Sequence, residues 1–430
     1  MWPACIASGS LLVAVALLAV RPDPARAWVR WIWPSDVAAA TSLLQTVATS
    51  VMTAYSLTFS ITLVAIQLAS QQFSPRLLRT FARDWIVQAA MAVFISAFVV
   101  SLTTLRGVHA DQPLPVFGVL LSLLLGLASA AMLIVFISHM VRRVRIDDMM
   151  TAVHHDTVVT LQDTYATYGQ GPEDPRDAEV PGPDGGVLIT ATASGFIRTI
   201  DPERLVRLAR RHDAFLRIWV RPGDSVIRGT PLATVFPTAD TSLPVDVLTH
   251  DLNVAVSFAS ERTEEQDVGY GLRQLVDICL KAISPAINDP TTAAEALSYC
   301  TDLLVRLQGR RLGSQLKRDS DGTARVVLPS RDLRYYLNLT CGQVRRFGRS
   351  EPTVLVAVLR LLRDVAVNAR DDDQRREIAE QTSLVLAEIP AEMLKQDADS
   401  VRDLADRVHR ALSADVQSAY NDRAGETRSI

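Results

Sequence analysis

Four apolar stretches occupy the first third of the chain. A helix needs about 20 apolar residues to cross a bilayer, and these stretches meet that length or come close to it. They lie at about 4–20, 37–70, 86–105 and 115–140. The pattern therefore predicts a transmembrane domain of four helices over residues 1–145, followed by a region that is much richer in charge.

The second stretch carries polar residues along one side. No residue from Val37 to Ser70 is charged, and hydroxyl and amide side chains recur at helical spacing with one missed turn at Leu63. This spacing places them on one face of a helix. They are Thr46, Thr49, Thr53, Ser56, Ser60 and Gln67. Because an unpaired polar group is costly in hydrocarbon, we expect this polar stripe to face protein or water.

Two further patterns concern how the helices are placed. Ser74-Pro75 predicts the start of a helix with Arg76, Arg79 and Arg83 on one side. It can lie on anionic lipid headgroups or be an ordinary loop helix in water. In the fourth stretch, small residues at every fourth position predict close packing against another span. They are Gly118, Ser122, Gly126 and Ala130.

Arginine counts near the ends of the spans predict their orientation. Six arginines follow the second and fourth stretches, against four on the opposite side, which favours a cytoplasmic C-terminal region in a bacterial inner membrane. Ala25-Arg26-Ala27 has the form of a signal-peptidase site. Residues 1–27 can thus be a retained span or a cleaved signal, and the predicted orientation is the same in both cases.

The charged region divides into three predicted parts. Residues 146–186 form a helical connector with a Pro/Gly linker, and 187–245 alternate as strands do. The turn within 220–235 resembles that of biotinyl and lipoyl barrel domains, but no lysine lies between 187 and 280 to carry a cofactor. This part is therefore predicted to be a barrel-like structural module, and residues 246–430 a mainly helical domain. The predicted fold is a transmembrane helical bundle followed by a cytoplasmic α+β region.

Two strings resemble a known family. FSITLVAIQLASQQFSPRLLRTFARD (59–84) and ERTEEQDVGYGLRQLVDICLKAISPAINDP (261–290) are similar to bacterial predicted membrane proteins catalogued as domain of unknown function 2254. The resemblance implies an integral membrane protein with N-terminal spans and a soluble C-terminal region. It implies no particular biochemical activity.

The second string also contains candidates for a site, five polar residues and one proline of the family motif. They are Arg262, Glu265, Asp267, Asn288, Asp289 and Pro290. In one interpretation Asp289 and a helix N-terminus form an ion or anion site. In the other, Asn-Asp-Pro simply caps a helix, which needs no ligand.

Composition narrows the function classes. A net charge of −3 and the lack of a concentrated basic face argue against a nucleic-acid partner. The four cysteines have no metal-binding or redox spacing, so buried reduced thiols are expected rather than a metal site. No catalytic or cofactor-binding motif stands in a supporting context, so neither an enzyme nor a cofactor is predicted.

These patterns favour two functions. The first is a homo-oligomeric channel in which the polar stripe of the second span lines a water-filled path. The second is a membrane-anchored sensor or scaffold whose soluble region binds a ligand or partner, with the stripe forming contacts between helices. The permeant, the ligand and the number of copies do not follow from the sequence.

Overall fold

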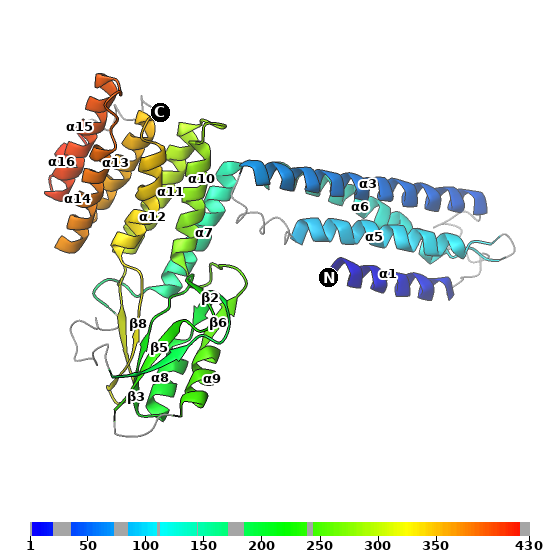
Figure 1. The fold of residues 1–430 in the computed structure, drawn as a ribbon. Coiled ribbons are helices and arrows are strands. Elements are labelled where there is room, and N and C mark those ends of the chain that lie inside the picture. Colours follow the sequence, from blue (N-terminus) through cyan, green and yellow to red (C-terminus); the bar gives the residue numbers. More distant parts are fainter. Residues whose placement is uncertain are drawn as a thin grey trace. The chain divides into compact units, whose positions relative to one another are not determined.

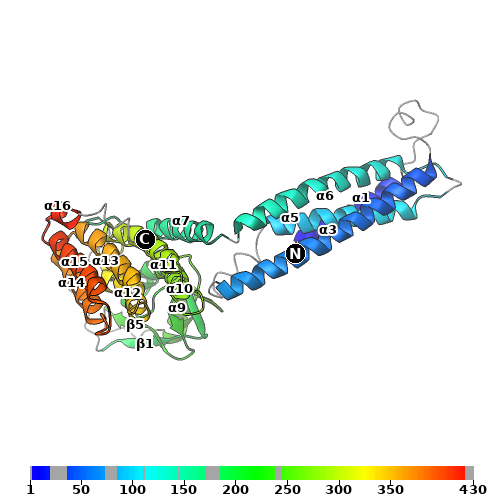
Figure 2. The ribbon, with the colours of Figure 1, turned by 90° about the horizontal axis from the view of Figure 1, so that it is seen from above.

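The computed structural model describes residues 2–19, 36–72, 85–109, 112–143, 145–170, 185–238 and 244–421. The chain divides into two compact units, Met1–Met149 and Met150–Ile430. Figure 1 and Figure 2 show the helices of the first unit and the mixed helices and strands of the second. The predicted basic helix with Arg76, Arg79 and Arg83 lies outside the described residues.

The first unit is a bundle of four apolar helices. They are α1 (Trp2–Ala19), α3 (Val37–Gln72), α5 (Trp85–Arg106) and α6 (Val116–Arg143). Three of them, α3, α5 and α6, are long and apolar enough to cross a membrane, whereas the apolar part of α1 is shorter, Cys5–Ala19. The described helices thus match the predicted stretches, with three candidate spans, and a fourth span in α1 stays a prediction.

Small residues allow these helices to pack closely, as the sequence predicted. A Cβ atom on Gly118 of α6 would lie 2.8 Å from the Thr104 side chain of α5. A Cβ atom on Gly126 would lie 3.2 Å from Val47 of α3. The Ser10 hydroxyl of α1 donates to that of Ser96 in α5 at 2.8 Å. The small residues of α6 therefore form contacts within one chain.

In the second unit, two small β-sheets share one hydrophobic core. The strands are β1 (Val187–Thr190), β2 (Gly195–Ile200), β3 (Ala214–Ile218), β4 (Ser225–Val226), β5 (Pro231–Pro237), β6 (Val256–Ala259), β7 (Gln315–Arg318) and β8 (Ala324–Leu328). Their order is β1-β5-β3-β8-β7 in one sheet and β4-β2-β6 in the other. Buried side chains such as Ile197, Leu216 and Val256 fill the core between the sheets. Helices α8 (Pro202–Arg211) and α9 (Val245–Ala255) also pack on it.

The five-stranded sheet extends past the predicted 187–245 module. Strands β7 and β8 form a hairpin with Asp321-Gly322 at its tip, and β8 pairs in parallel with β3, placing Leu216 opposite Val326. The structure therefore builds this β region from two segments that are separated by helices in the sequence.

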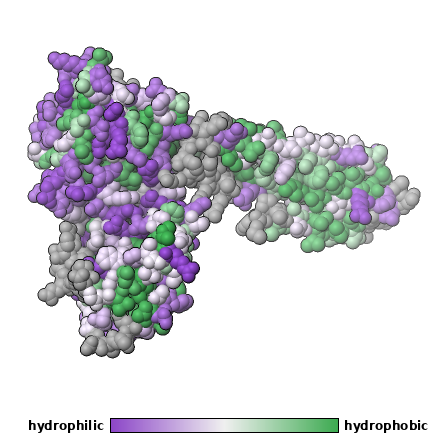
Figure 3. All heavy atoms as spheres, in the orientation of Figure 1, coloured by the Kyte–Doolittle hydropathy of each residue, from purple (hydrophilic) through white to green (hydrophobic). Residues whose placement is uncertain are grey.

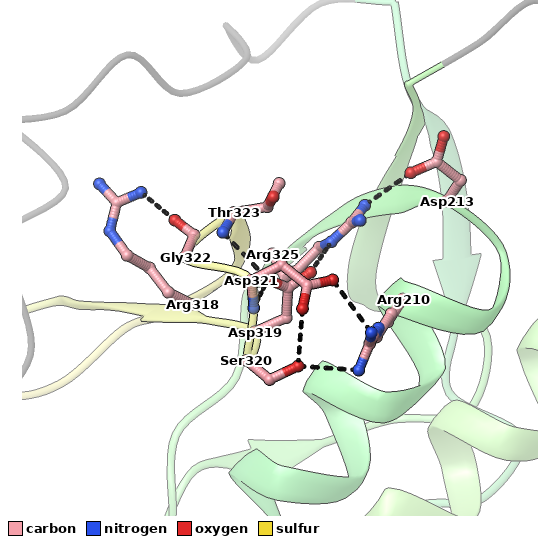
Figure 4. A network of polar contacts seen from close by, with 9 residues as sticks. All are labelled: Arg210, Asp213, Arg318, Asp319, Ser320, Asp321, Gly322, Thr323 and Arg325. Carbon is pink, nitrogen blue, oxygen red and sulfur yellow. Dashed lines mark hydrogen bonds and ion pairs between the residues drawn. The ribbon is translucent and has the colours of Figure 1, made fainter.

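A polar network holds the tip of this hairpin against α8 (Figure 4). Asp319 accepts hydrogen bonds from the backbone N–H groups of Asp321 at 3.0 Å and Thr323 at 2.9 Å. Its other oxygen contacts Arg325 Nε at 2.8 Å. Arg210 of α8 reaches Asp321 at 3.0 Å. The hydrogen bond from Arg325 is the main cause that lowers the pKa of Asp319, so this carboxyl group stays ionised.

The remaining helices form a layer of their own. They are α7 (Ile146–Thr164), α10 (Val268–Ala282), α11 (Pro290–Gln308), α12 (Leu333–Phe347), α13 (Pro352–Val367), α14 (Asp372–Ala387), α15 (Lys395–Leu412) and α16 (Val416–Ala419). Aspartates begin several of them, since Asp289, Asp332 and Asp371 each accept a backbone N–H three residues later. Such caps satisfy N–H groups that a helix leaves free at its start.

Figure 3 shows how differently the surfaces of the two parts are composed. Hydrophobic residues gather over the long N-terminal helices, where Leu127 and Ile134 of α6 are 62% and 68% exposed. Hydrophilic residues dominate over the C-terminal helices. An apolar surface of this kind is what lipid chains cover in a membrane protein.

Candidate functional site

The polar stripe of α3 points away from the bundle. Its members Thr49, Thr53, Ser56, Ser60 and Gln67 are all exposed. The buried positions of the same helix are Ala40, Leu44, Ala48, Val51, Thr58 and Ala65. At about 3.6 residues per turn, the two sets lie on opposite sides of the helix. Within one chain, therefore, the packed face of α3 is apolar except for Thr58, and the polar stripe lies on the free side of the helix, flanked by exposed apolar residues such as Leu57 and Phe59.

Part of this polar face is satisfied by the helix itself. Thr46 donates to the carbonyl of Ser42 at 2.7 Å, and Thr53 donates to that of Thr49 at 2.9 Å. Such bonds to the preceding turn lower the cost of a hydroxyl in lipid. The side chain of Gln67 carries two N–H donors and a carbonyl acceptor, which is more than one bond to the preceding turn could satisfy.

A second candidate site surrounds Asp267, which is 3% exposed. Its carboxylate contacts Arg262 Nε at 2.5 Å, and the guanidinium of Arg262 lies 5.5 Å from the ring centre of Tyr270. Burial alone would lower the pKa of Arg262, but the hydrogen bond and charge of Asp267 outweigh it and raise that pKa. We call Arg262, Asp267 and the residues that pack around them the Arg262–Asp267 cluster. The surrounding residues are Gly223, Asp224, Arg331, Tyr335, Tyr165 and Tyr336.

The turn between β3 and β4 packs directly on this cluster. Gly223 has φ of +85°, and a Cβ atom there would overlap the carboxylate of Asp267. The next residue, Asp224, binds Arg331 at 2.9 Å, and Arg331 stacks 4.1 Å from the ring centre of Tyr335. The cluster thus joins the β region to the start of α12.

A pair of tyrosines extends the cluster toward α7. The hydroxyls of Tyr165 and Tyr336 are 2.7 Å apart, and Ser330 donates to Tyr165 at 3.3 Å. Burial raises the pKa of both tyrosines, so both stay neutral. Glu265, in contrast, is exposed and pairs with Arg198 of β2 at 2.6 Å.

The other predicted candidates lie elsewhere. Asp289 caps α11, accepting from the N–H of Thr292 at 3.1 Å and from its hydroxyl at 2.6 Å. These bonds lower the pKa of Asp289. Asn288 adopts φ of +52°, and Pro290 is the first helical residue. The length of α10, 15 residues or about 22 Å, separates this cap from Asp267.

Several members of the cluster were not predicted from the sequence. Gly223, Asp224, Arg331 and the two tyrosines come from segments that are far from 261–290 in the chain. A Pro-Gly-Asp turn at 222–224 signals a tight turn, but nothing in the string indicates its partner. Among the described residues, no group of three or more His, Cys, Asp and Glu could hold a metal ion.

Comparison with known proteins gives one family. Residues 1–364 match the family described as "Predicted membrane protein (DUF2254)". The uncharacterized proteins Rv1290c of Mycobacterium tuberculosis and Mb1321c of Mycobacterium bovis are each 35% identical over 361 residues. The match covers 81% of this chain and 67% of each relative. No solved structure matches the chain.

Proposed function

Because the chain belongs to the predicted membrane protein family DUF2254, we propose that it is a multi-pass protein of the bacterial cytoplasmic membrane that self-associates around a water-filled path. In this proposal the polar stripe of α3 lines the path. The observation that supports it most is the direction of the stripe, which is exposed on the side opposite the packed face of α3.

The energetic argument concerns what can cover the stripe. A polar group without a partner in hydrocarbon costs several kcal/mol, and Ser56, Ser60 and Gln67 follow one another along the same face. Lipid chains offer no hydrogen bonds, whereas water or the stripe of another copy does. Copies that turn this face toward a common centre would satisfy it and keep the apolar faces of α6 in lipid.

The same arrangement limits what could pass. No residue from Val37 to Gln72 is charged, so α3 has no side chain that could bind or relay a proton tightly. Hydroxyls and amides would contact small polar solutes or hydrated ions weakly. We therefore propose passive permeation and no catalytic reaction.

The arginine counts support a cytoplasmic location for the second unit, with lipids as the partners of the outer helix faces. In the bundle, the start of α3 packs near the start of α6, through Leu44 and Val119. The helices α3 and α6 thus run in one direction, and both would end on the side where six arginines follow.

Conductance in reconstituted bilayers tests the proposal. Ser56→Leu and Ser60→Leu should reduce the current or change its selectivity, because they replace hydroxyls of the path by apolar groups. Phe59→Leu is the matched control, since Phe59 is 53% exposed and lies on the flank of the same helix turn. Folded protein that carries no current and forms no assembly would contradict the proposal.

A second function is favoured by a different observation. Thr46 and Thr53 already bond to their own helix, which makes lipid or helix contact less costly for part of the stripe. In this alternative the protein is a membrane-anchored sensor or scaffold, and its second unit binds a ligand or partner. Uniform protection of the stripe from water together with ligand binding would support it.

A further inference from the structure

A polar cleft opens in the second unit, far along the chain from α3. Its volume is about 560 Å³, within the range of small-molecule sites. Two chain segments lie side by side at its edge, because Tyr168 N–H donates to Gly309 at 2.9 Å and Arg311 N–H donates to Ala166 at 2.9 Å. The first turns of α12 and α14 complete the walls.

Most charges in the cleft already have partners. Arg334 binds Glu377 at 2.8 Å, and Arg376 pairs with Asp373. The remaining two carboxylates of the lining serve as helix caps. Asp332 accepts the N–H of Tyr335 at 2.9 Å, and Asp371 accepts that of Gln374 at 2.8 Å.

The two remaining arginines of the cleft lining are consecutive in the chain. Arg310 and Arg311 both line the cleft, and among the described residues neither has a carboxylate within ion-pair distance. Arg310 donates one bond to the carbonyl of Tyr165 at 3.0 Å. The lining as a whole holds four arginines and four carboxylates, so its formal charge is zero. Arg310 and Arg311 are the two arginines of the lining whose guanidinium groups are available to an anionic ligand.

An aromatic ring lies beside this pair. Tyr168 is 38% exposed, and its hydroxyl donates to Asp371 at 2.9 Å, which fixes the ring. Arg370 lies 5.4 Å from the ring centre. The hydrogen bond to Asp371 raises the pKa of Tyr168, so its hydroxyl stays neutral. Arg311 lines the same cleft as Tyr168, and its backbone N–H is bonded to Ala166, two residues before the ring.

We propose that this cleft binds a small molecule that joins a phosphate group to a planar ring, as a nucleotide does. Guanidinium groups match the oxygens of a phosphate in two-point contacts. A base stacked on an aromatic side chain gains about 1–3 kcal/mol in other proteins. The phosphate would bind Arg310 and Arg311, and the ring would lie on Tyr168. The proposal does not depend on a conducting path through α3.

Calorimetric titration of the full chain in detergent with AMP tests this site. We expect saturable binding of one AMP per chain, and Arg311→Gln should weaken it at least tenfold, or about 1.4 kcal/mol. Arg349→Gln is the matched control, because Arg349 is exposed beyond the far end of α12, about 22 Å from the cleft. It should bind AMP as the unchanged protein does.

Two further titrations separate the parts of the ligand. Tyr168→Leu should weaken AMP but leave inorganic phosphate unaffected, and adenosine should bind more weakly than AMP. The proposal is overturned if AMP gives no saturable signal at millimolar concentration. It is equally overturned if adenosine binds as well as AMP, or if Arg311→Gln and Arg349→Gln lose the same affinity.

Discussion

Gly223→Ala tests how strongly the Arg262–Asp267 cluster holds the second unit together. Gly223 has φ of +85°, and a Cβ atom would overlap the carboxylate of Asp267. Gly229 is the matched control: it lies in the same β region at φ of +87° and has nothing within 4 Å of the added atom. Both substitutions strain the backbone, but only Gly223→Ala also displaces Asp267 from Arg262.

The two contributions can be estimated separately. A non-glycine residue in the left-handed region costs about 1–2 kcal/mol, and this applies to both variants. Breaking a buried ion pair costs about 3–5 kcal/mol. The side chain of Arg262 is still 21% exposed, so water recovers part of this loss. We therefore expect Gly223→Ala to lose about 2–3 kcal/mol more than Gly229→Ala.

The assay is thermal unfolding of the full chain in detergent, followed by circular dichroism at one scan rate. For a unit of this size, 1 kcal/mol corresponds to about 2–4 °C in Tm. Gly223→Ala should therefore unfold about 4–12 °C below Gly229→Ala. Equal Tm values for the two variants would refute the inference that Asp267 and Arg262 stabilise this turn.

Two other predictions concern the second unit. Gly271→Ala should lower the Tm because the added methyl group overlaps the Thr157 hydroxyl between α10 and α7. Adding Thr157→Ala to this variant should recover part of the loss. Strictly additive losses in Tm would contradict the contact between Gly271 and Thr157. The pKa of Asp319 is lowered, mainly by Arg325, so its ionised form stabilises the fold above the unfolded pKa of about 3.9. The Tm difference between the unchanged protein and Asp319→Asn should thus be constant from about pH 5 to 8 and shrink as pH falls below about 4. A difference that grows in acid would contradict it.

Local features of the fold could be predicted from the sequence. Apolar runs without charge located the long helices, and Asn-Asp-Pro at 288–290 marked the start of α11. Asp321-Gly322 is a dipeptide typical of a tight hairpin turn, and Gly322 adopts φ of +80° there. Each of these features depends on residues that are close in the chain, so the string itself contains the information.

Long-range pairings could not be predicted in the same way. The parallel pairing of β3 with β8 joins Leu216 to Val326 across several helices, and strand patterns do not specify such partners. The contact of Gly223 with Asp267 is of the same kind. For α3, the spacing showed that the polar residues share a face. Only the packing of α5 and α6 on Leu44 and Val51 shows that the polar face is the side of α3 that no other described helix of the bundle covers.

The central claim is that water reaches the polar face of α3 in the membrane, and thiol labelling tests it most directly. Three native cysteines suit this assay: Cys279, Cys300 and Cys341 are buried, and burial raises the pKa of each thiol, to about 12 for Cys279 and Cys341. The exposed Cys5 would be replaced by serine.

Single cysteines at Ser56 and Ser60 are compared with one at Phe59, which is 53% exposed on the flank of α3. Membranes holding the protein are treated with a charged, water-soluble maleimide. The account predicts rapid labelling of Ser56→Cys and Ser60→Cys and slow labelling of Phe59→Cys. Equal protection of all three positions in folded protein would contradict it.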